Sequence, residues 1–293
     1  MEILVFGAGS LGSLLGGLLA RAHDVTLVGR ESHVRAIERA GLRIEGEIEA
    51  TVATTARTDP PASADLAVVA VKAGDTAGAA DALADCDLDA CLSVQNGLGN
   101  EATLADALDC PVLAGTCTYG ARLGDPGTVE CTGVGEVVLG PREGGESTLA
   151  DRIGRAFSEG GIETIVAADM PARLWEKLAV NAAINATTAL ARVPNGALVD
   201  GPASTVAERA ARETAAVARE HGVDLSGDDA AAAALGVADD TARNTSSMRQ
   251  DVEAGRRTEI DAINGYIVAN ADDVAVPVNE TLAALVRAWE AGQ

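Results

Sequence analysis

A short apolar strand followed by a glycine-rich turn constrains the fold of this chain more than any other feature of its sequence. Residues 3–6 are apolar, and Gly7-Ala8-Gly9-Ser10-Leu11-Gly12 follows them directly, at the start of a helix-like stretch. In a strand–turn–helix unit, the first glycine permits the tight turn, the second lets a ligand approach the backbone, and the third lets helix and strand pack closely. The helix N-terminus then favours a pyrophosphate. The motif predicts a dinucleotide-binding site.

Short apolar runs alternate with helix-like stretches through the first half of the chain. Strands separated by helices predict βαβ units, in which a parallel sheet carries helices on both faces. The expected strands are residues 3–6, 25–28, 66–71, 91–94, 112–116, 128–139 (with a turn at Gly133 and Gly135) and 162–166, and the expected helices include residues 11–20, 76–84 and 101–108.

The pattern changes after Asp169. Residues 170–191 predict one long helix, which Pro194-Asn195-Gly196 ends, and residues 203–293 show helical periodicity without a convincing strand. We therefore expect an α/β protein with a Rossmann-type parallel-sheet domain at residues 1–167 and an all-helical domain at residues 168–293.

The charge balance is strongly acidic, with 44 Asp and Glu against 22 Lys and Arg and a net charge of −22. Such a surface repels nucleic acid and anionic membranes, so neither is an expected partner. Salt at 1 M shortens the Debye length to about 3 Å and removes most of the self-repulsion. The excess of acid therefore suggests a halophilic protein that works in a salt-rich cytoplasm.

Other features agree with a cytoplasmic location. No apolar run approaches the ~20 residues of a membrane span, and the N-terminal strand leaves no room for a signal peptide. The five cysteines form no C-x-x-C pair and the three histidines are scattered, so we expect reduced thiols and no metal site. The Ala-rich helical half suggests a homodimer.

The end of the second predicted strand bears on the choice of dinucleotide. An NAD site usually carries Asp or Glu about 20 residues past the glycines, to hold the ribose 2′-OH. Here the strand ends in Val28-Gly29-Arg30. The planar guanidinium of Arg30 suits a 2′-phosphate and favours NADP. Glu31 follows directly, so NAD use stays open, as does a plain surface role for Arg30.

Only two of the 22 basic residues are lysines, Lys72 and Lys177. Lys72 ends an apolar strand, and Asn96 holds the same position after the next strand. Ligands of open α/β sheets bind outside the carboxyl ends of the strands, which places both side chains at the dinucleotide crevice. The plainer alternatives are a strand-end charge in water for Lys72 and a turn dipeptide for Asn96-Gly97.

Three polar residues follow one face of the predicted helix at 170–191. Lys177, Asn181 and Asn185 are spaced four apart and are largely surrounded by Ala, Val and Ile. An unpaired buried polar group costs ~1–3 kcal/mol, so these groups need partners. They either face a ligand in a cleft, as the two-domain organisation favours, or pair with the neighbouring domain.

Near the C-terminus, Gly255 separates two predicted helices. Thr258 and Asp261 have the spacing of a capping box that would open the second helix. On position alone, Glu259 is a first-turn acid favoured by the helix dipole.

These residues together resemble the ketopantoate reductase (2-dehydropantoate 2-reductase) family, from Gly7 to about Gly265. The glycine turn is common to all Rossmann enzymes, whereas the stretch around Lys177 and the last two segments are specific. Besides the glycine turn, the resemblance is carried by Val71-Lys72-Ala73, Gln95-Asn96-Gly97-Leu98-Gly99, Leu174-Trp175-Glu176-Lys177-Leu178-Ala179-Val180-Asn181, Pro194-Asn195-Gly196, Asn244-Thr245-Ser246-Ser247-Met248-Arg249-Gln250-Asp251 and Thr258-Glu259-Ile260-Asp261-Ala262-Ile263-Asn264-Gly265.

The resemblance implies NADPH-dependent reduction of a small 2-oxo acid, ketopantoate, in pantothenate and coenzyme A biosynthesis. It implies that Lys177 is the proton donor and that Glu259 orients substrate or cofactor hydroxyls. The implied cofactor contacts are Gly7, Ala8, Gly9, Ser10, Leu11, Gly12, Arg30 (to the 2′-phosphate), Lys72, Asn96, Ala121 (through its backbone) and Glu259. The implied substrate contacts are Asn96, Lys177, Asn181, Asn185, Asn195 and Ser247.

The substrate carboxylate has two sets of candidate partners in the sequence. Asn and Ser donors can suffice, or a basic group such as Arg249 contributes. Two other functions stay open, a sister dehydrogenase acting on another 2-oxo or 3-hydroxy acid and a non-catalytic NADP redox sensor. The joint presence of Lys177, Glu259 and the asparagines argues against the sensor, which needs only the first domain.

Overall fold

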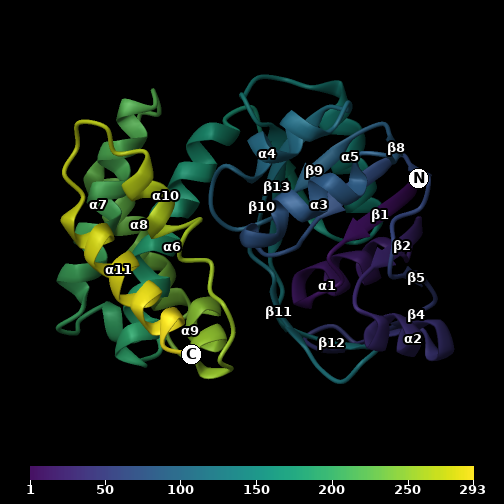
Figure 1. The fold of residues 1–293 in the computed structure, drawn as a ribbon, viewed down its shortest axis with the longest axis horizontal. Coiled ribbons are helices and arrows are strands. Elements are labelled where there is room, and N and C mark those ends of the chain that lie inside the picture. Colours follow the sequence, from purple (N-terminus) through teal and green to yellow (C-terminus); the bar gives the residue numbers. More distant parts are fainter. The chain divides into compact units, whose positions relative to one another are not determined.

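The computed structural model describes residues 1–293, and the chain divides into two compact units (Figure 1). The first contains Met1–Gln95 and Asn100–Met170, and the second contains Asn96–Gly99 and Pro171–Gln293. The four residues 96–99 therefore group with the second unit, although the chain on both sides of them belongs to the first. The sequence placed the division between residues 167 and 168.

The first unit is an α/β domain. Its elements are β1 (Glu2–Phe6), α1 (Ser10–Leu19), β2 (Asp24–Val28), α2 (Glu31–Ala40), β3 (Leu42–Gly46), β4 (Ala50–Val52), β5 (Thr55–Arg57), β6 (Ser63–Ala64), β7 (Leu66–Val69), the 3₁₀ helix η1 (Ala73–Asp75), α3 (Thr76–Leu83), β8 (Asp87–Leu88), β9 (Cys91–Ser93), α4 (Asn100–Ala107), β10 (Val112–Cys117), β11 (Gly120–Leu123), β12 (Thr128–Gly133), β13 (Glu136–Pro141), α5 (Thr148–Glu159) and β14 (Glu163–Val166).

The main sheet has eight strands in the order β14-β13-β10-β9-β7-β1-β2-β5. The six strands from β10 to β5 are parallel to their neighbours, which confirms the predicted parallel sheet. The prediction was wrong at one edge, where β13 pairs with β10 in antiparallel fashion and β14 is parallel to β13. Antiparallel neighbours can be joined without a crossover helix. The chain between β10 and β13 forms the β11–β12 hairpin.

Successive side chains of the central strands point to opposite faces of the sheet, and a core forms on each face. In β1, Ile3 and Val5 join the cluster formed with α1, α2 and α5, whereas Leu4 joins the cluster formed with α3 and α4. Strands buried on both faces are expected to be almost continuously apolar, and residues 66–69 are an example. The predicted helices on both faces are confirmed; α2 and α5 were not singled out in the sequence.

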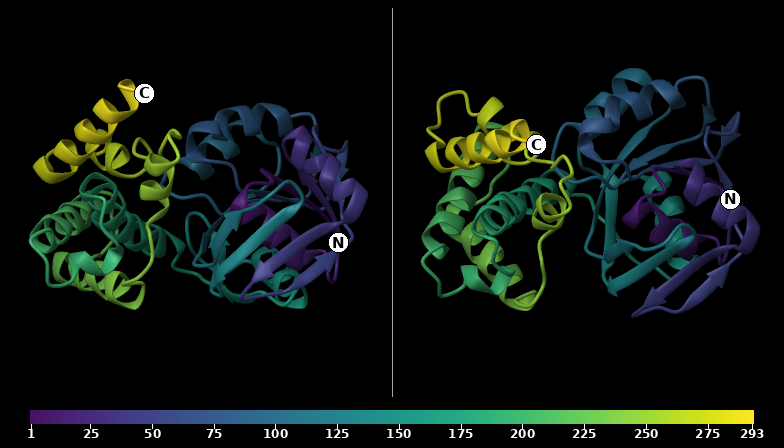
Figure 2. Two further views of the ribbon diagram at one scale, coloured as in Figure 1. Left: turned by 90° about the horizontal axis from the view of Figure 1, so that it is seen from below. Right: turned by 60° about the horizontal axis from the view of Figure 1, so that its bottom comes forward.

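A second sheet, absent from the predictions, has the order β11-β12-β3-β4 (Figure 2). Helix α1 packs between the two sheets because it carries two adjacent glycines. A Cβ on Gly16 would lie 2.3 Å from Leu27 of the main sheet, and one on Gly17 would lie 2.9 Å from Ile44 and from Leu42 of the second. The helix that follows the glycine turn is thus held on two sides.

The second unit is helical, as predicted. Its elements are α6 (Met170–Ala191), η2 (Asn195–Leu198), α7 (Ser204–Glu220), α8 (Gly227–Asp240), α9 (Ser247–Glu253), α10 (Asn264–Ala269) and α11 (Pro277–Ala291). Helix α6 has the predicted bounds and lies among α7, α8, α10 and α11 (Figure 1). Its buried alanines contribute to two clusters, one with α10 and α11 and one with α7 and α8. Small side chains let these helices approach closely, in keeping with the scarcity of aromatic residues.

The predicted capping box at Thr258 is wrong. Residues 259–263 form turns, and α10 begins at Asn264. The Thr258 hydroxyl donates to Glu290 (2.7 Å) and accepts from the Ile260 N–H (3.2 Å). Asp261 accepts from Arg287 of α11 (2.8 Å) instead of capping the backbone. Tertiary partners on α11 therefore replace the local cap.

All five cysteines are free thiols, as predicted, and Cys91, Cys117 and Cys131 are buried. None of the helices combines the length and the apolar character that crossing a bilayer requires.

One buried carboxyl predicts how stability depends on pH. Glu101 of α4 is buried, its Oε1 atom has no hydrogen-bond partner, and burial raises its pKa. The folded protein then binds this proton more tightly than the unfolded chain, whose glutamate titrates near 4.3. The contribution of this carboxyl to the free energy of unfolding is fully present below the pKa of the unfolded chain. It is lost as the pH rises through the folded-state pKa.

We therefore expect Glu101→Gln to remove the decrease in stability that Glu101 causes as the pH rises. Urea unfolding at constant salt between pH 4 and pH 8 should show a variant whose advantage over the parent grows with pH and then levels off. An advantage independent of pH would contradict the prediction, and Glu176→Gln, at an exposed position of α6, is the control.

Candidate functional site

The glycine turn after β1 lies against the carboxyl ends of two neighbouring strands. The N–H groups of Gly7 and Ala8 donate to the Val28 carbonyl at the end of β2 (3.0 and 2.8 Å). Gly7 has a φ of +105°, and a Cβ there would lie 2.8 Å from the Val71 nitrogen beyond β7. The turn therefore requires glycine at this position for both conformation and space.

The N-terminus of α1 fits a pyrophosphate. Its N-cap residue, Gly9, offers no side chain to cap the first-turn N–H groups. A Cβ on Gly9 would meet no protein atom closer than 4.0 Å, whereas one on Gly12 would lie 2.1 Å from the Gly7 carbonyl oxygen. Gly12 is thus required by the fold, and Gly9 leaves open space above the helix end. Together the donors and the space form a cradle for an anion.

Strand β11 lies beside this cradle. The Ser10 hydroxyl accepts a hydrogen bond from the Leu123 N–H (3.0 Å), which ties the first residue of α1 to the end of β11. Ala121 lies on the same strand, next to a shift in the β11–β12 register. Ala121 therefore lies on the strand that flanks Gly7–Gly12.

Arg30 and Lys72 lie at the carboxyl ends of β2 and β7. Arg30 is exposed at the N-cap of α2, and Lys72 is half-buried at the N-cap of η1. Gly29 permits the first placement, because a Cβ there would lie 2.8 Å from the Ala8 side chain. Both cations thus belong to the sheet edge that carries the glycine turn, as predicted.

His33, which the sequence did not single out, anchors the start of α2. Its Nδ1 accepts from the Gly127 N–H (3.0 Å), so the proton lies on Nε2, which donates to the Ser13 hydroxyl (3.0 Å). Burial, and then the nearby Arg30 guanidinium, lower the pKa of His33 and keep the ring neutral. A buried neutral imidazole therefore joins α2 to α1 below the glycine turn.

A second set of residues missed in the sequence joins the ends of β7 and β9. Gln95 donates to the Thr76 hydroxyl (2.7 Å) and to the Val71 carbonyl (3.1 Å), and its oxygen accepts from Ser93 (3.3 Å). Thr76 in turn donates to Asn100 (2.8 Å). This buried network fixes the two chain ends from which loop 96–99 leaves the first unit. The signal in the sequence is that Gln95 opens a segment that carries the family resemblance, and Asn100 follows the end of that segment.

In the second unit, loop 96–99 is bonded to the segment that carries Glu259. The Asn96 amide donates to a Glu259 carboxylate oxygen (3.0 Å), and the Leu98 N–H points to the Ala262 carbonyl (3.4 Å). Gly97 has a φ of +85°, and a Cβ there would lie 2.4 Å from the same carbonyl oxygen. Close backbone packing therefore explains Gly97 better than a free turn does.

Helix α6 presents the predicted polar stripe. Lys177, Asn181 and Asn185 follow one another at intervals of one turn between Met170 and Ala191. Asn185 is buried, and the buried Asn181 amide nitrogen has no hydrogen-bond partner. Since a buried unpaired donor costs ~1–3 kcal/mol, this amide nitrogen is suited to donate to an oxygen of a ligand.

Two contacts join this stripe to the other predicted residues of the unit. Asn264, five residues after Glu259, donates to the Ala182 carbonyl of α6 (3.1 Å). Thr188 of α6 is bonded to Ser246, the N-cap of α9, with the two hydroxyl oxygens 2.7 Å apart. Ser247 follows as the exposed first residue of α9. Loop 96–99, Glu259 and Ser247 are thus all fixed to the framework of α6.

Asn195 and Arg249, two candidate contacts to the substrate, are bonded to other protein side chains. Asn195 is buried, donates to the Thr241 hydroxyl (2.9 Å) and keeps an unpartnered side-chain oxygen. Arg249, a candidate for the substrate carboxylate, pairs with Glu253 (2.7 Å). Arg249 is therefore engaged by an acid one turn further along its own helix.

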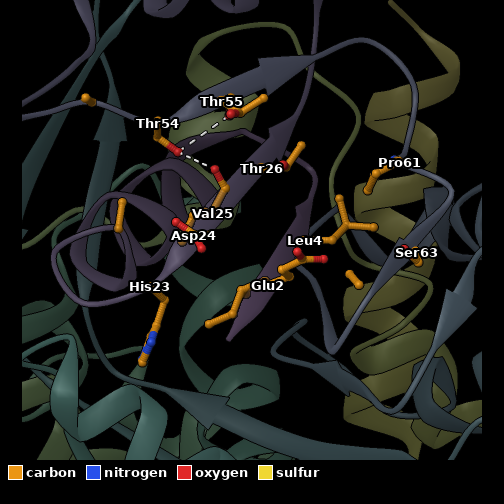
Figure 3. Close-up of a pocket in the computed structure, with 14 residues that line it drawn as sticks. Glu2, Leu4, His23, Asp24, Val25, Thr26, Thr54, Thr55, Pro61 and Ser63 are labelled. Atoms are coloured by element: carbon orange, nitrogen blue, oxygen red, sulfur yellow. Dashed lines mark hydrogen bonds between the residues drawn. The ribbon is translucent and has the colours of Figure 1, made fainter.

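A large open depression of about 690 Å³ lies elsewhere, at the amino ends of β1 and β2 (Figure 3). Glu2, Asp24, Thr54 and Thr55 line it, and His23 is engaged by the Ala156 carbonyl (2.7 Å). Dinucleotides bind at the opposite, carboxyl edge of such sheets. The depression is therefore separate from the glycine turn.

The two units thus define a dinucleotide-dependent oxidoreductase, with an anion cradle on one and a polar stripe of lysine and asparagines on the other. The family models for ketopantoate reductase PanE/ApbA and for its C-terminal part match residues 3–144 and 169–290, respectively. The chain belongs to the ketopantoate reductase family.

Individual relatives agree with this assignment. A 2-dehydropantoate 2-reductase from Halobacterium salinarum is 46% identical, with 98% of each chain covered. The structure is similar to a PanE/ApbA family ketopantoate reductase from Ralstonia eutropha JMP134, with a TM-score of 0.92, 37% identity and coverage of 100% and 99%. It is also similar to D-mandelate dehydrogenase with NADH and anilino(oxo)acetate, with a TM-score of 0.93, 26% identity and the same coverage. The predicted family, fold class and oxidoreductase class are confirmed.

The cradle leads to a prediction that separates binding from folding. Gly9→Ala places a methyl group in open space, so the protein should keep its melting temperature, yet this group occupies the space where a pyrophosphate would approach. We expect the dissociation constant of the dinucleotide, measured by fluorescence titration, to rise by at least about tenfold, or ~1.4 kcal/mol.

Gly12→Ala is the matched control, because its Cβ clashes with the turn itself. We expect that variant to lose both thermal stability and binding. Unchanged dinucleotide affinity in Gly9→Ala would show that the cradle is not the binding site.

Proposed function

We propose that the chain reduces 2-dehydropantoate to pantoate with NADPH, in the biosynthesis of pantothenate and coenzyme A. The observation that carries the proposal is the unpartnered, buried Asn181 amide on the same helix face as Lys177. A ligand oxygen is the partner that such a donor lacks. The names of the curated relatives supply the substrate.

Residues of the first unit would hold the cofactor. The N–H groups at Gly7–Gly12 suit the pyrophosphate, Ala121 offers a backbone contact from β11, and Lys72 and Arg30 supply positive charge at the sheet edge. NADPH, when bound, supplies the hydride that reduces the ketone carbon. We infer NADP rather than NAD from Arg30, and the NADH-bound neighbour keeps NAD as the alternative.

Residues of the second unit would hold the substrate and supply the proton. As the ketone is reduced, negative charge grows on its oxygen, and the Lys177 ammonium stabilises this charge and donates the proton. Asn181, Asn185, Asn195 and Ser247 are proposed to hold the rest of the substrate.

Asn96 is proposed to contact both cofactor and substrate. The Glu259 carboxylate accepts from the Asn96 amide (3.0 Å). In the proposal this bond orients the amide, and the carboxylate also accepts from a ligand hydroxyl. Glu259 is a catalytic residue in this proposal.

A second candidate function is reduction of a different 2-oxo acid. The similarity to D-mandelate dehydrogenase supports it, because that enzyme shares the fold over the whole chain at 26% identity. Nothing in the structure favours the NADP redox sensor, which gives no role to the polar stripe of α6.

We also propose a salt-rich cytoplasm as the place of action. The net charge of −22 and the relative from Halobacterium salinarum support this inference. A homodimer through Ala-rich helical surface remains part of the proposal.

The function is tested by a substrate panel. Oxidation of NADPH and NADH should be followed in molar salt with ketopantoate, pyruvate, 2-oxoisovalerate and phenylglyoxylate. We expect kcat/KM for ketopantoate with NADPH to exceed each of the other combinations by at least about 100-fold, or ~2.7 kcal/mol. Equal turnover of phenylglyoxylate would favour the second candidate, and no turnover at all would favour the sensor.

The role of Lys177 is tested by Lys177→Met. Removing a general acid that also stabilises an oxyanion should lower kcat by about 10²–10⁴-fold. NADPH affinity, measured by fluorescence, should stay unchanged. Lys177→Arg keeps the charge but lacks an ammonium that can give up its proton, so it should restore substrate affinity more than kcat. Near-normal kcat in Lys177→Met would contradict the role.

A further inference from the structure

We propose that Arg57, on the edge strand β5, is a second cation for the 2′-phosphate of NADP and thus a specificity-determining residue. This inference rests on the proposed function, since only NADP carries that phosphate. Nothing in the sequence motifs singles out Arg57, because it lies 27 residues after Arg30 in a region without a family signature.

The sheet places Arg57 beside the end of β2. Strands β2 and β5 are parallel neighbours, with Val28 opposite Arg57 in register. The Gly29 N–H donates to the Arg57 carbonyl (3.0 Å), so the backbone of Arg57 touches the residue that precedes Arg30. Neighbouring strands lie about 4.8 Å apart, a distance that two arginine side chains span easily.

Alternation along β5 gives the face on which Arg57 lies. Ala56 is buried in the cluster that contains α1 and α2. The next residue therefore belongs to the other face, and its register partner Val28 is buried there in the cluster with Val69 and Ala79. Arg57 thus lies on the α3 side of the carboxyl edge.

At the carboxyl ends of β2 and β5, the guanidinium groups of Arg30 and Arg57 are not paired with acids and can bind a phosphate. Most arginines near carboxylates in this acidic chain are paired, as Arg35 is with Glu31. Neither Arg30 nor Arg57 forms an ion pair, and both are exposed. Asp59, the nearest acid along the chain, accepts from the Thr58 hydroxyl (3.0 Å). Two unpaired arginines on adjacent strand ends suit a phosphate dianion.

The Glu31–Arg35 pair adds to the same specificity. An acid after the second strand holds the ribose 2′-OH in NAD sites and repels a 2′-phosphate. Here Arg35, one turn further along α2, engages the Glu31 carboxylate. The acid that would favour NAD is therefore partly neutralised by a residue of its own helix.

The test is Arg57→Gln, with cofactor binding measured by fluorescence of the bound nicotinamide in the absence of substrate. We expect the dissociation constant for NADPH to rise about tenfold, as for loss of one hydrogen bond to a charged group. The constant for NADH should not change, and the salt dependence of NADPH binding should weaken. A general loss of structure would weaken both cofactors equally and lower the melting temperature.

Two further variants make the outcome unambiguous. Arg155→Gln, at an exposed and unpaired arginine of α5, matches the change in net charge and should leave both constants unchanged. Arg30→Gln should weaken NADPH selectively. If Arg30→Gln does so and Arg57→Gln does not, the inference about Arg57 is overturned while the NADP proposal stands. If the parent protein does not prefer NADPH over NADH, both are overturned.

Discussion

The close backbone packing of the glycine turn is the constraint on which the rest of the first unit depends. Gly7 can sit against Val71 and accept a φ of +105° only without a side chain, and its N–H donates to the end of β2. This packing sets where α1 begins. The pair Gly16 and Gly17 then lets α1 lie between two sheets, and packing on both sides holds the helix end that is proposed to bind an anion. Preorganised donors of this kind need no rearrangement when a ligand arrives.

Elements with a strong local period could be predicted from the sequence. Helix α6 has the predicted bounds, and the central parallel strands lie within a few residues of the predicted ones, because buried strands and an Ala-rich helix have clear hydrophobic patterns. The glycine turn and the stripe of Lys177, Asn181 and Asn185 also follow from spacing alone. These features depend on residues close together in the chain.

Features that depend on distant partners could not be predicted. Loop 96–99 groups with the helical unit because of contacts with Glu259 and Ala262, more than 160 residues away. Thr258 is bonded to Glu290 and not to its own helix, which no local pattern indicates. The second sheet joins short strands from two parts of the chain, β3–β4 and β11–β12. In each case a tertiary contact outweighs the local propensity.

The proposed salt-rich environment would favour a site built largely from neutral donors. In concentrated salt the Debye length falls to about 3 Å, so long-range attraction by a basic patch would be largely screened. Hydrogen bonds at contact distance survive this screening, and the structure offers them as backbone N–H groups at α1, amides on α6 and the Asn96–Glu259 pair. Arginines near acids are mostly neutralised, as in the Arg249–Glu253 pair. Free cations are then most useful where a doubly charged group must be bound at short range, and the unpaired arginines at the ends of β2 and β5 meet that requirement.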